Sequence, residues 1–429
     1  SEAVDWHHRR VSSLKSDPEY AALFEHLSKD GSLHDLPEIS LPTRLSETPK
    51  PSVRKERPDV SGAGDVCLTP AGDPILTGKD AEEAYVALTE RAKRFPFLTP
   101  TGNSEKRPRI AVVSSMRNEA PFILEWIAYN RSIGVTDFLI FTNDCDDQTV
   151  AILDRLSDLN IVKRRDNPFD SEKGQRPQRI ALNVAASDPI VTQADWTLVI
   201  DNDEFIDIHV GDGTLPSLIR EMGDPNVISM TWRMFGNSGI NEFEDAFISE
   251  QFTRASPKFL PKPRLGWGFK SMTHRSAPFN KIGVHRPLEL NMDRVDEVRW
   301  VNGSGRVMPD ELVQGNGWRS TKRTIGYEMV TLNHYVLRSA DSYLVKRQRG
   351  RINHVDQDQG FDYWARRNYN SERVDTIERH LPRARKEFDA LLDDEILATL
   401  HKEAVAWHAE RIASLKPSPD YQALYEAIT

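Results

Sequence analysis

From Arg109 onward, short apolar runs alternate with longer amphipathic segments along the chain. Runs of a few residues rich in β-branched and aromatic side chains are typical of buried strands, and apolar residues at helical spacing are typical of covering helices. The predicted elements are a strand at 110–113, a helix at 121–133, a strand at 138–141, a helix at 150–159, a strand at 161–162, a helix at 178–186 and a strand at 196–200. This alternation predicts an α/β fold, with a mostly parallel sheet and helices on both faces.

The segments that flank this domain carry a weaker pattern. Residues 37–58 are rich in Pro, Ser, Thr and charged residues, which is typical of a linker or a surface strap, and a short helix is predicted at 80–94. The chain is therefore expected to contain an N-terminal helical hairpin at 1–36, a linker with a short helix at 37–107, the α/β domain at 108–351 and a C-terminal helical region at 352–429.

The two ends of the chain repeat each other. Residues 6–25 and 407–426 share Trp, His, Arg, Ser, Leu, Lys, Pro, Tyr, Ala, Leu and Glu in register. Each copy is predicted to form a helix, a break and a second helix that opens with Pro near its first turn. One explanation is a structural hairpin that packs on the domain or on the other copy. The other is a docking element, through which a homo-oligomer or a join between tandem modules would form.

Composition excludes several classes of protein. With 429 residues, 38% hydrophobic and 28% charged, the chain can bury a full core, which excludes a disordered or fibrous protein. No apolar run approaches the roughly 18 residues that a membrane-spanning helix needs, so no transmembrane segment is expected. A net charge of −9 argues against nucleic acid as the partner. Because only Cys67 and Cys145 are present, we expect a reducing, cytoplasmic location.

A group of carboxylates follows the apolar strand predicted at 196–200. Asp201, Asp203 and Glu204 come directly after this strand, at the sheet edge where α/β proteins bind ligands. Asp201 and Asp203 can present oxygens to one hard cation, which in turn can bridge two phosphate oxygens. An Asp-x-Asp pair alone is most often a solvated turn. The apolar strand before it and the alternating architecture favour a metal and phosphate site here.

Further motifs follow the first and second predicted strands. They are Arg117, Asn118, Glu119, Phe122, Glu125, Trp126, Tyr129 and Gly134, and then Thr142, Asn143, Asp147 and Thr149. With the Asp-x-Asp-Glu-Phe run at 201–205, this combination resembles the family 2 glycosyltransferases over about residues 109–351. The resemblance implies a GT-A (Rossmann-like) fold, a nucleotide-sugar donor with a UDP-sugar foremost, Mn²⁺ or Mg²⁺, a glycan or glycoconjugate acceptor, and inversion at the anomeric carbon.

The resemblance also implies roles for individual residues. The donor is expected to contact Ser115, Arg117, Glu119, Asn143, Asp147, Asp201, Lys270 and Arg349. Lys270 and Arg349 come from two basic segments, whose cations would stabilise the leaving diphosphate. These segments could instead form a surface held by salt bridges. The expected metal ligands are Asp201, Asp203 and a histidine, and His334 ranks ahead of His285 because it follows an apolar strand.

An aromatic and glycine-rich stretch at 232–239 resembles the loop on the acceptor side of related enzymes. Inversion needs a general base for the acceptor hydroxyl, and a carboxylate just beyond this loop would supply it. Asp245 is the first candidate for that catalytic role and Glu250 the second, with Glu242 and Glu244 behind them.

Three other functions compete with glycosyl transfer. A sugar nucleotidyltransferase usually opens with a glycine-rich loop, but residues 114–119 contain no glycine. A non-catalytic sugar-binding or scaffold protein would not need to keep like charges together at Asp201, Asp203 and Glu204. The basic segments alone would suit a protein that binds nucleic acid, but the acidic net charge argues against it.

Overall fold

The computed structural model describes residues 66–68, 74–76, 78–92, 96–98, 107–170, 175–260, 264–350 and 359–429. The chain divides into two units, Ser1–Val66 and Cys67–Thr429. The hairpin predicted at 1–36 and much of the linker lie outside the described residues. Ahead of the main sheet, β1 (Val66–Leu68) pairs with β2 (Pro74–Leu76), and α3 (Gly78–Ala92) includes residues 80–92 of the helix predicted at 80–94, whose last two residues lie outside the described residues.

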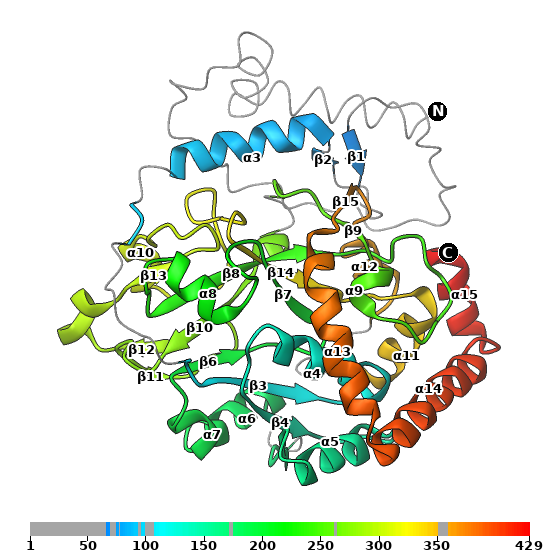
Figure 1. Cartoon of the computed structure of the whole chain (residues 1–429). Helices are drawn as coiled ribbons and strands as arrows, with labels where there is room; N and C mark the ends of the chain where they lie inside the picture. The colour runs from blue at the N-terminus through cyan, green and yellow to red at the C-terminus, as the bar shows by residue number, and fades with distance from the viewer. Residues whose placement is uncertain are drawn as a thin grey trace. The chain divides into compact units, whose positions relative to one another are not determined.

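A sheet of nine strands forms the centre of the second unit (Figure 1). Its strands are β3 (Ile110–Met116), β4 (Asp137–Thr142), β5 (Lys163–Asp166), β6 (Trp196–Val199), β7 (Glu204–Ile208), β8 (Val227–Met234), β10 (Phe269–His274), β13 (Trp300–Val301) and β14 (Val330–His334). The order is β5-β4-β3-β6-β10-β8-β14-β7, with β13 beside β8. Only β10 and β7 run antiparallel to the other strands of this sheet, which confirms the predicted α/β fold with a mostly parallel sheet.

Helices cover both faces of the sheet. Val112 and Ile140 pack toward α4 and α5, whereas Val113 and Leu139 pack toward α6 and α7. The alternation follows from the two-residue period of strands. The helices are α4 (Ala120–Ser132), α5 (Thr149–Asp158), α6 (Pro177–Ala185), α7 (Pro189–Thr192), α8 (Leu215–Glu221), α9 (Ile248–Gln251), α10 (Asp310–Val313), α11 (Ala340–Arg349), α12 (Phe361–Ala365), α13 (Leu381–Leu392), α14 (Glu395–Leu415) and α15 (Pro419–Ile428). The short elements are β9 (Arg254–Ala255), β11 (Phe279–Lys281), β12 (Leu288–Leu290), β15 (Glu372–Arg373) and the 3₁₀ helices η1 (Arg264–Trp267), η2 (Met292–Glu297) and η3 (Thr376–His380).

One predicted strand was misplaced. The strand expected at 161–162 is instead β5, Lys163–Asp166. The backbone N–H groups of Ile161 and Val162 both donate to Leu156 O, so these two residues form the turn after α5. Val162 is buried in that turn, and the strand itself carries charged side chains because it lies at the edge of the sheet.

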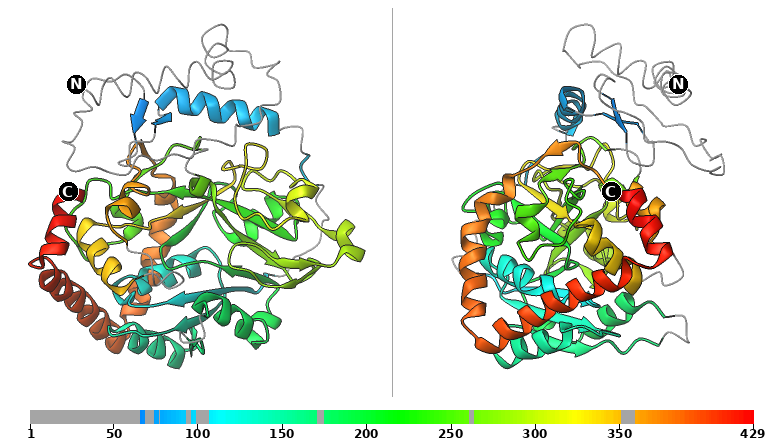
Figure 2. Two further views of the ribbon diagram at one scale, coloured as in Figure 1. Left: turned by 180° about the vertical axis from the view of Figure 1, so that it is seen from behind. Right: turned by 90° about the vertical axis from the view of Figure 1, so that its right-hand side faces the viewer.

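The C-terminal helices pack on the central domain. α13 packs on α4, α14 packs on α4, α5 and α11, and α15 packs on α11 and α12. Figure 2 shows α13 and α14 meeting at a sharp angle. The C-terminal copy of the repeat therefore forms the predicted helix, break and second helix, with Pro419 in the first turn of α15. Within the described residues, none of the helices has the length and apolar character needed to cross a bilayer.

Candidate active site

The turn between β6 and β7 presents the acidic residues at the carboxyl end of β6. β6 ends at Val199 and β7 begins at Glu204, and the backbone N–H of Glu204 donates to Asp201 O over 3.0 Å. β7 pairs with β14, and this register places His334 opposite Glu204. The sheet topology thus brings residues from near position 200 together with residues from near position 340.

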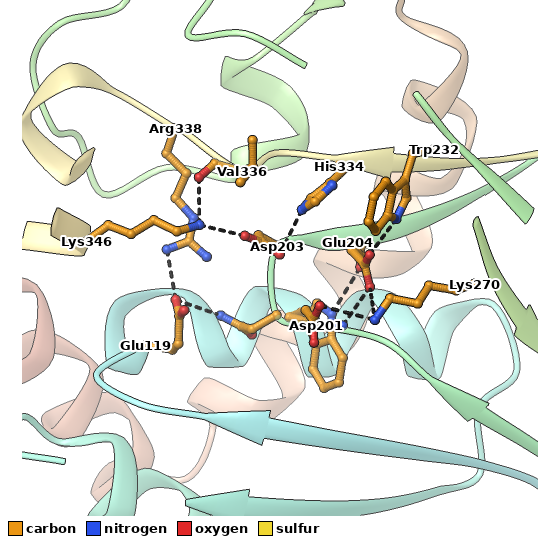
Figure 3. A network of polar contacts seen from close by, with 12 residues as sticks. Glu119, Asp201, Asp203, Glu204, Trp232, Lys270, His334, Val336, Arg338 and Lys346 are labelled. Atoms are coloured by element: carbon orange, nitrogen blue, oxygen red, sulfur yellow. Dashed lines mark hydrogen bonds and ion pairs between the residues drawn. The ribbon is translucent and has the colours of Figure 1, made fainter. Parts of the chain in front are cut away.

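Asp203 is the centre of the resulting cluster, with a carboxylate between Lys346 and His334 (Figure 3). Its Oδ2 accepts a hydrogen bond from Lys346 Nζ at 2.8 Å, and its Oδ1 lies 3.5 Å from His334 Nε2. Only 8% of the residue is exposed. Burial alone would raise the pKa of Asp203, but the nearby charge of Lys346 and the His334 ring outweigh burial and hold this pKa well below its usual range.

Glu119 forms a second buried ion-pair group beside Asp203. Its carboxylate lies 2.9 Å from Arg338 Nη1 and 2.5 Å from Arg349 Nη2. Burial would raise the pKa of Glu119, but the charges of Arg349 and Arg338 lower it to about 2. Arg349 Nη1 also donates to the backbone carbonyls of Arg117 and Asn118, at 2.6 and 2.9 Å. These contacts tie the end of α11 to the loop after β3.

On the other side of the turn, Lys270 and Glu204 hold Asp201. Lys270 is fully buried, and its Nζ lies 3.2 Å from Asp201 Oδ2 and 3.5 Å from Glu204 Oε2. Glu204 accepts hydrogen bonds from the Asp201 backbone N–H at 2.7 Å and from Trp232 Nε1 at 2.6 Å. Burial raises the pKa of Glu204 to about 7 despite the charge of Lys270. Glu204 therefore orients both the acidic turn and the Trp232 ring.

Arg338 retains hydrogen-bond donors that an anion could use. Its Nη1 donates to Glu119, and its guanidinium lies 3.7 Å from the centre of the Phe122 ring. Its Nε and Nη2 are buried and have no hydrogen-bond partner among the described residues. Buried N–H groups of this kind are costly unless an acceptor reaches them, and guanidinium groups match phosphate oxygens well. The site can thus receive a phosphate group beside Asp203.

The side chains at Asp203 provide some of the ligands that one divalent cation needs. Among the described residues, no group of three or more His, Cys, Asp or Glu side chains forms a ready-made metal centre. Asp203 and His334 offer one oxygen and one nitrogen 3.5 Å apart, as two neighbouring ligands of one ion would. Mg²⁺ and Mn²⁺ sites commonly complete such a pair with substrate phosphates and water. The Asp201 oxygens contact Gln178 and Lys270 instead.

Four residues predicted to bind the donor lie at the ends of β3 and β4 without a described side-chain contact to Asp203. Asp147 accepts hydrogen bonds from the backbone N–H groups of Ala120 and Thr149, so it caps the start of α4. Ser115 is buried within β3. The side chains of Arg117 and Asn143 both contact Asp144. Their roles in donor binding stay predictions.

The two predicted general bases contact the C-terminal helices. Asp245 Oδ1 lies 3.2 Å from His401 Nε2 on α14. Glu250 forms a two-point ion pair with Arg385 on α13. No described contact joins either carboxylate to the Asp203 cluster, so the structure does not bring these predicted bases together with the predicted metal ligands.

Lys346 and Arg338 were recognised only as members of a basic segment. Their partners are 143 and 219 positions away in the sequence. A signal was nevertheless present, because Lys346 and Arg349 are three residues apart and therefore share one face of α11. His334 was ranked ahead of His285, and only His334 faces Asp203. His285 Nδ1 donates to Phe269 O at 3.0 Å, and the ring stacks on Trp318.

The comparisons with known proteins point to one class. Residues 109–303 match the family model described as Glycosyltransferase family 92. The chain is 24% identical over 313 residues to a glycosyltransferase family 92 protein of Oryza sativa subsp. japonica, which covers 67% of this chain and 47% of the relative. A Ricinus communis protein of the same description is 23% identical over 158 residues, 36% of this chain and 28% of the relative. The chain thus spans about half the length or less of these curated relatives.

Two solved structures are also similar in part. Staphylococcus aureus TarS is 17% identical to this chain, with a TM-score of 0.23, and the match covers 32% of this chain and 23% of the TarS chain. Mannosyl-3-phosphoglycerate synthase from Rubrobacter xylanophilus is 14% identical to this chain, with a TM-score of 0.26, and the match covers 47% of this chain and 66% of the synthase chain. The sequence comparisons group the central domain with the glycosyltransferases, as the motifs predicted. The matching family model is family 92, whereas the motifs resemble family 2.

Proposed function

We propose that this protein is a metal-dependent glycosyltransferase. It transfers a sugar from a nucleoside diphosphate sugar, a UDP-sugar foremost, to a hydroxyl group of a glycan or glycoconjugate, with inversion at the anomeric carbon. The observation that carries the proposal is the buried cluster of Asp203, His334 and Lys346, together with the glycosyltransferase match over residues 109–303.

The cations of the site suit a leaving diphosphate. As the bond between sugar and diphosphate breaks, negative charge develops on the phosphate oxygens, and preorganised cations stabilise it most strongly where water is excluded. Arg338 has buried N–H groups to donate, and Lys346 and Arg349 lie beside it. Asp203 and His334 would hold Mn²⁺ or Mg²⁺, which when bound supplies further positive charge to the diphosphate.

Asp201 has a different task from Asp203 in this proposal. Gln178 Nε2 donates to Asp201 Oδ1 at 3.0 Å, and Lys270 contacts Asp201 Oδ2. A carboxylate fixed in this way at the strand end is suited to accept hydrogen bonds from the donor ribose or to bind a water molecule of the metal. Lys270 is fully buried and places its ammonium group next to that carboxylate.

Aromatic rings next to the cluster suit the acceptor. Trp232 is oriented by Glu204, and its ring centre lies 4.7 Å from that of His334 and 5.9 Å from that of Trp318. Trp318 is partly exposed, with Arg319 over its ring. Flat apolar faces with a few polar groups are typical of sugar sites. The sequence predicts Asp245 first and Glu250 second as the general base, and this order stays a prediction, since neither carboxylate has a described contact with the Asp203 cluster.

The test is to incubate the full chain with a panel of nucleotide sugars and Mn²⁺ and to measure release of the nucleoside diphosphate. Release from one sugar nucleotide, and its loss in EDTA, are the expected results. A sugar nucleotidyltransferase would instead release pyrophosphate from a nucleoside triphosphate and a sugar phosphate. Binding of sugar nucleotides with no turnover in the presence of any acceptor would favour a non-catalytic protein.

A further inference from the structure

Lys346 forms an ion pair with Asp203, the carboxylate that is proposed to bind the metal. This inference therefore rests on the proposed function. Lys346 Nζ donates to Asp203 Oδ2 at 2.8 Å and to Val336 O at 2.6 Å. The Lys346 side chain is 12% exposed and that of Asp203 is 11% exposed. This is therefore a buried ion pair, and a metal ion that binds Asp203 must compete with it.

Lys346 differs from the neighbouring cations in how firmly it is held. Arg349 contacts Glu119 and two backbone carbonyls, and Arg338 contacts Glu119 and the face of the Phe122 ring. Both guanidinium groups are planar and are held by several contacts at once. Lys346 is a point charge on a flexible four-carbon chain, and Asp203 is the carboxylate it contacts. Of these three cations, Lys346 is the one that can most easily change partner.

Charge balance favours a change of partner when ligands arrive. A divalent ion at Asp203 would lie within a few ångströms of the Lys346 ammonium, and like charges repel strongly where water is excluded. A diphosphate alone would face the carboxylates of Asp203 and Glu119. When ion and diphosphate bind together, the ion pairs with Asp203 and the displaced ammonium pairs with phosphate oxygens. No buried charge is then left without a partner.

We propose that Lys346 exchanges partners during donor binding: it pairs with Asp203 in the free protein and with the donor diphosphate once a divalent cation binds Asp203. Two consequences follow. The metal alone binds weakly because Lys346 competes with it, and metal and nucleoside diphosphate bind cooperatively because each removes the repulsion that opposes the other.

The experiment measures binding in the full chain, separately from turnover. Mn²⁺ affinity without nucleotide is measured from the electron paramagnetic resonance signal of free Mn²⁺, and UDP affinity at saturating Mn²⁺ by calorimetry. Lys346→Met should bind Mn²⁺ about tenfold more tightly than the parent and bind UDP about tenfold more weakly, the low end of measured couplings between close charge pairs. The two changes have opposite signs, which a merely loosened fold would not produce.

Two matched variants accompany it. Lys346→Arg keeps a cation at the site and should bind Mn²⁺ as weakly as the parent. Lys386→Met removes the same charge from an exposed position on α13 and should leave both affinities unchanged. Lys346→Gln replaces Lys346→Met if the latter melts at a much lower temperature.

An unchanged or lower Mn²⁺ affinity in a folded Lys346→Met or Lys346→Gln variant overturns the exchange. An Mn²⁺ affinity that rises equally in Lys386→Met also overturns it, because net charge would then explain the effect. If instead the parent releases nucleoside diphosphate equally well in EDTA, the metal dependence of the proposed function fails, and that result is independent of the behaviour of Lys346.

Discussion

Lys416 Nζ lies 2.7 Å from Asp341 Oδ1, and this ion pair joins the C-terminal repeat to the first turn of α11. Asp420 on α15 pairs with Arg347 at 2.9 Å, and His408 Nε2 lies 3.2 Å from Ser342 Oγ. Lys346 and Arg349, further along α11, reach Asp203 and Glu119 in the candidate active site. The repeat is thus expected to position the site through α11, although its own residues do not reach Asp203.

Removal of residues 406–429 should therefore lower both stability and activity. It removes Ile412, Leu415, Leu424 and Ile428, which are buried in the main core, and each buried aliphatic side chain contributes roughly 1.5–3 kcal/mol. We expect a clearly lower melting temperature and reduced but measurable release of nucleoside diphosphate. A truncated chain with unchanged melting and no turnover at all would show that the repeat acts directly in the site.

A milder change tests positioning without loss of the core. The double variant Lys416→Met, Asp420→Asn removes two partly exposed ion pairs, which contribute about 0–1 kcal/mol each to stability. We expect a small change in melting temperature and a several-fold higher KM for the donor, since Lys346 and Arg349 would be less well placed. Unaltered donor kinetics would contradict this role of the repeat.

Asp203→Asn should abolish metal-dependent turnover, because an amide binds Mn²⁺ or Mg²⁺ far less well than a carboxylate does. We expect a loss of at least about 10³ in kcat/KM, on the scale of a lost catalytic electrostatic contact. The melting temperature should fall moderately, because Lys346 loses its buried ion-pair partner. The variant should still fold, since Asn has the same shape and Lys346 still donates to Val336 O. Turnover by the parent in EDTA would refute the role given to Asp203.

His334→Ala should weaken binding of nucleoside diphosphate with Mn²⁺ more than His285→Ala does. His334 Nε2 faces Asp203, whereas His285 contacts Phe269 O and stacks on Trp318. For His334→Ala we expect nucleoside diphosphate to bind about tenfold more weakly or worse, which is the effect seen when groups that support a metal site are changed. Calorimetric titration gives both affinities. Equal affinities in the parent and His334→Ala would remove this histidine from the site.

Asp245→Asn should lower kcat by roughly 10²–10⁴ with little effect on donor affinity if Asp245 is the general base. His401→Ala is the matched control, because it removes the partner of Asp245 but keeps the carboxylate. A fall in kcat of less than tenfold in Asp245→Asn, or an equal fall in His401→Ala, would indicate a structural role. Glu250→Gln would then be the next variant to measure.

Glu125 should make stability depend on pH. Its carboxylate is buried at the start of α9, where it accepts hydrogen bonds from the backbone N–H groups of Ile248 and Ser249. Burial outweighs these hydrogen bonds and raises the pKa of Glu125 to about 7. Because the pKa of Glu125 is higher in the folded state, the folded protein holds this proton more tightly than the unfolded chain does. The contribution of Glu125 to the free energy of unfolding is therefore complete below the unfolded pKa, near 4.5, and is lost as pH rises through about 7.

The free energy of unfolding of the parent should therefore fall, relative to that of Glu125→Gln, by on the order of 3 kcal/mol between about pH 4.5 and 8. Denaturant titrations of both proteins at several pH values measure this difference. The comparison concerns the slope with pH, since Gln also changes the hydrogen bonds to α9 at every pH. Curves that run parallel across this range would show that Glu125 titrates normally.

The local pattern of the sequence was sufficient for most of the elements that form the sheet and its helices. The period of apolar residues depends only on the few residues around each position, so β3, α4, β4, α5 and β6 were all found. It failed at β5, where an edge strand carries charge and the apolar pair before it lies in a turn. The position of Asp203 at a strand end and the preference for His334 were also accessible, because each follows an apolar strand.

The partners of these residues were decided by the tertiary structure alone. Lys346 reaches Asp203, and Arg349 reaches Glu119, because β14 pairs with β7 and α11 follows β14. Asp147, which is predicted to bind the donor, also caps the start of α4, since the backbone N–H groups at that helix start need an acceptor. Which carboxylate stays free for chemistry depends on which cations and N–H groups the fold brings to it. Pairings across more than a hundred residues leave no periodic trace in the sequence.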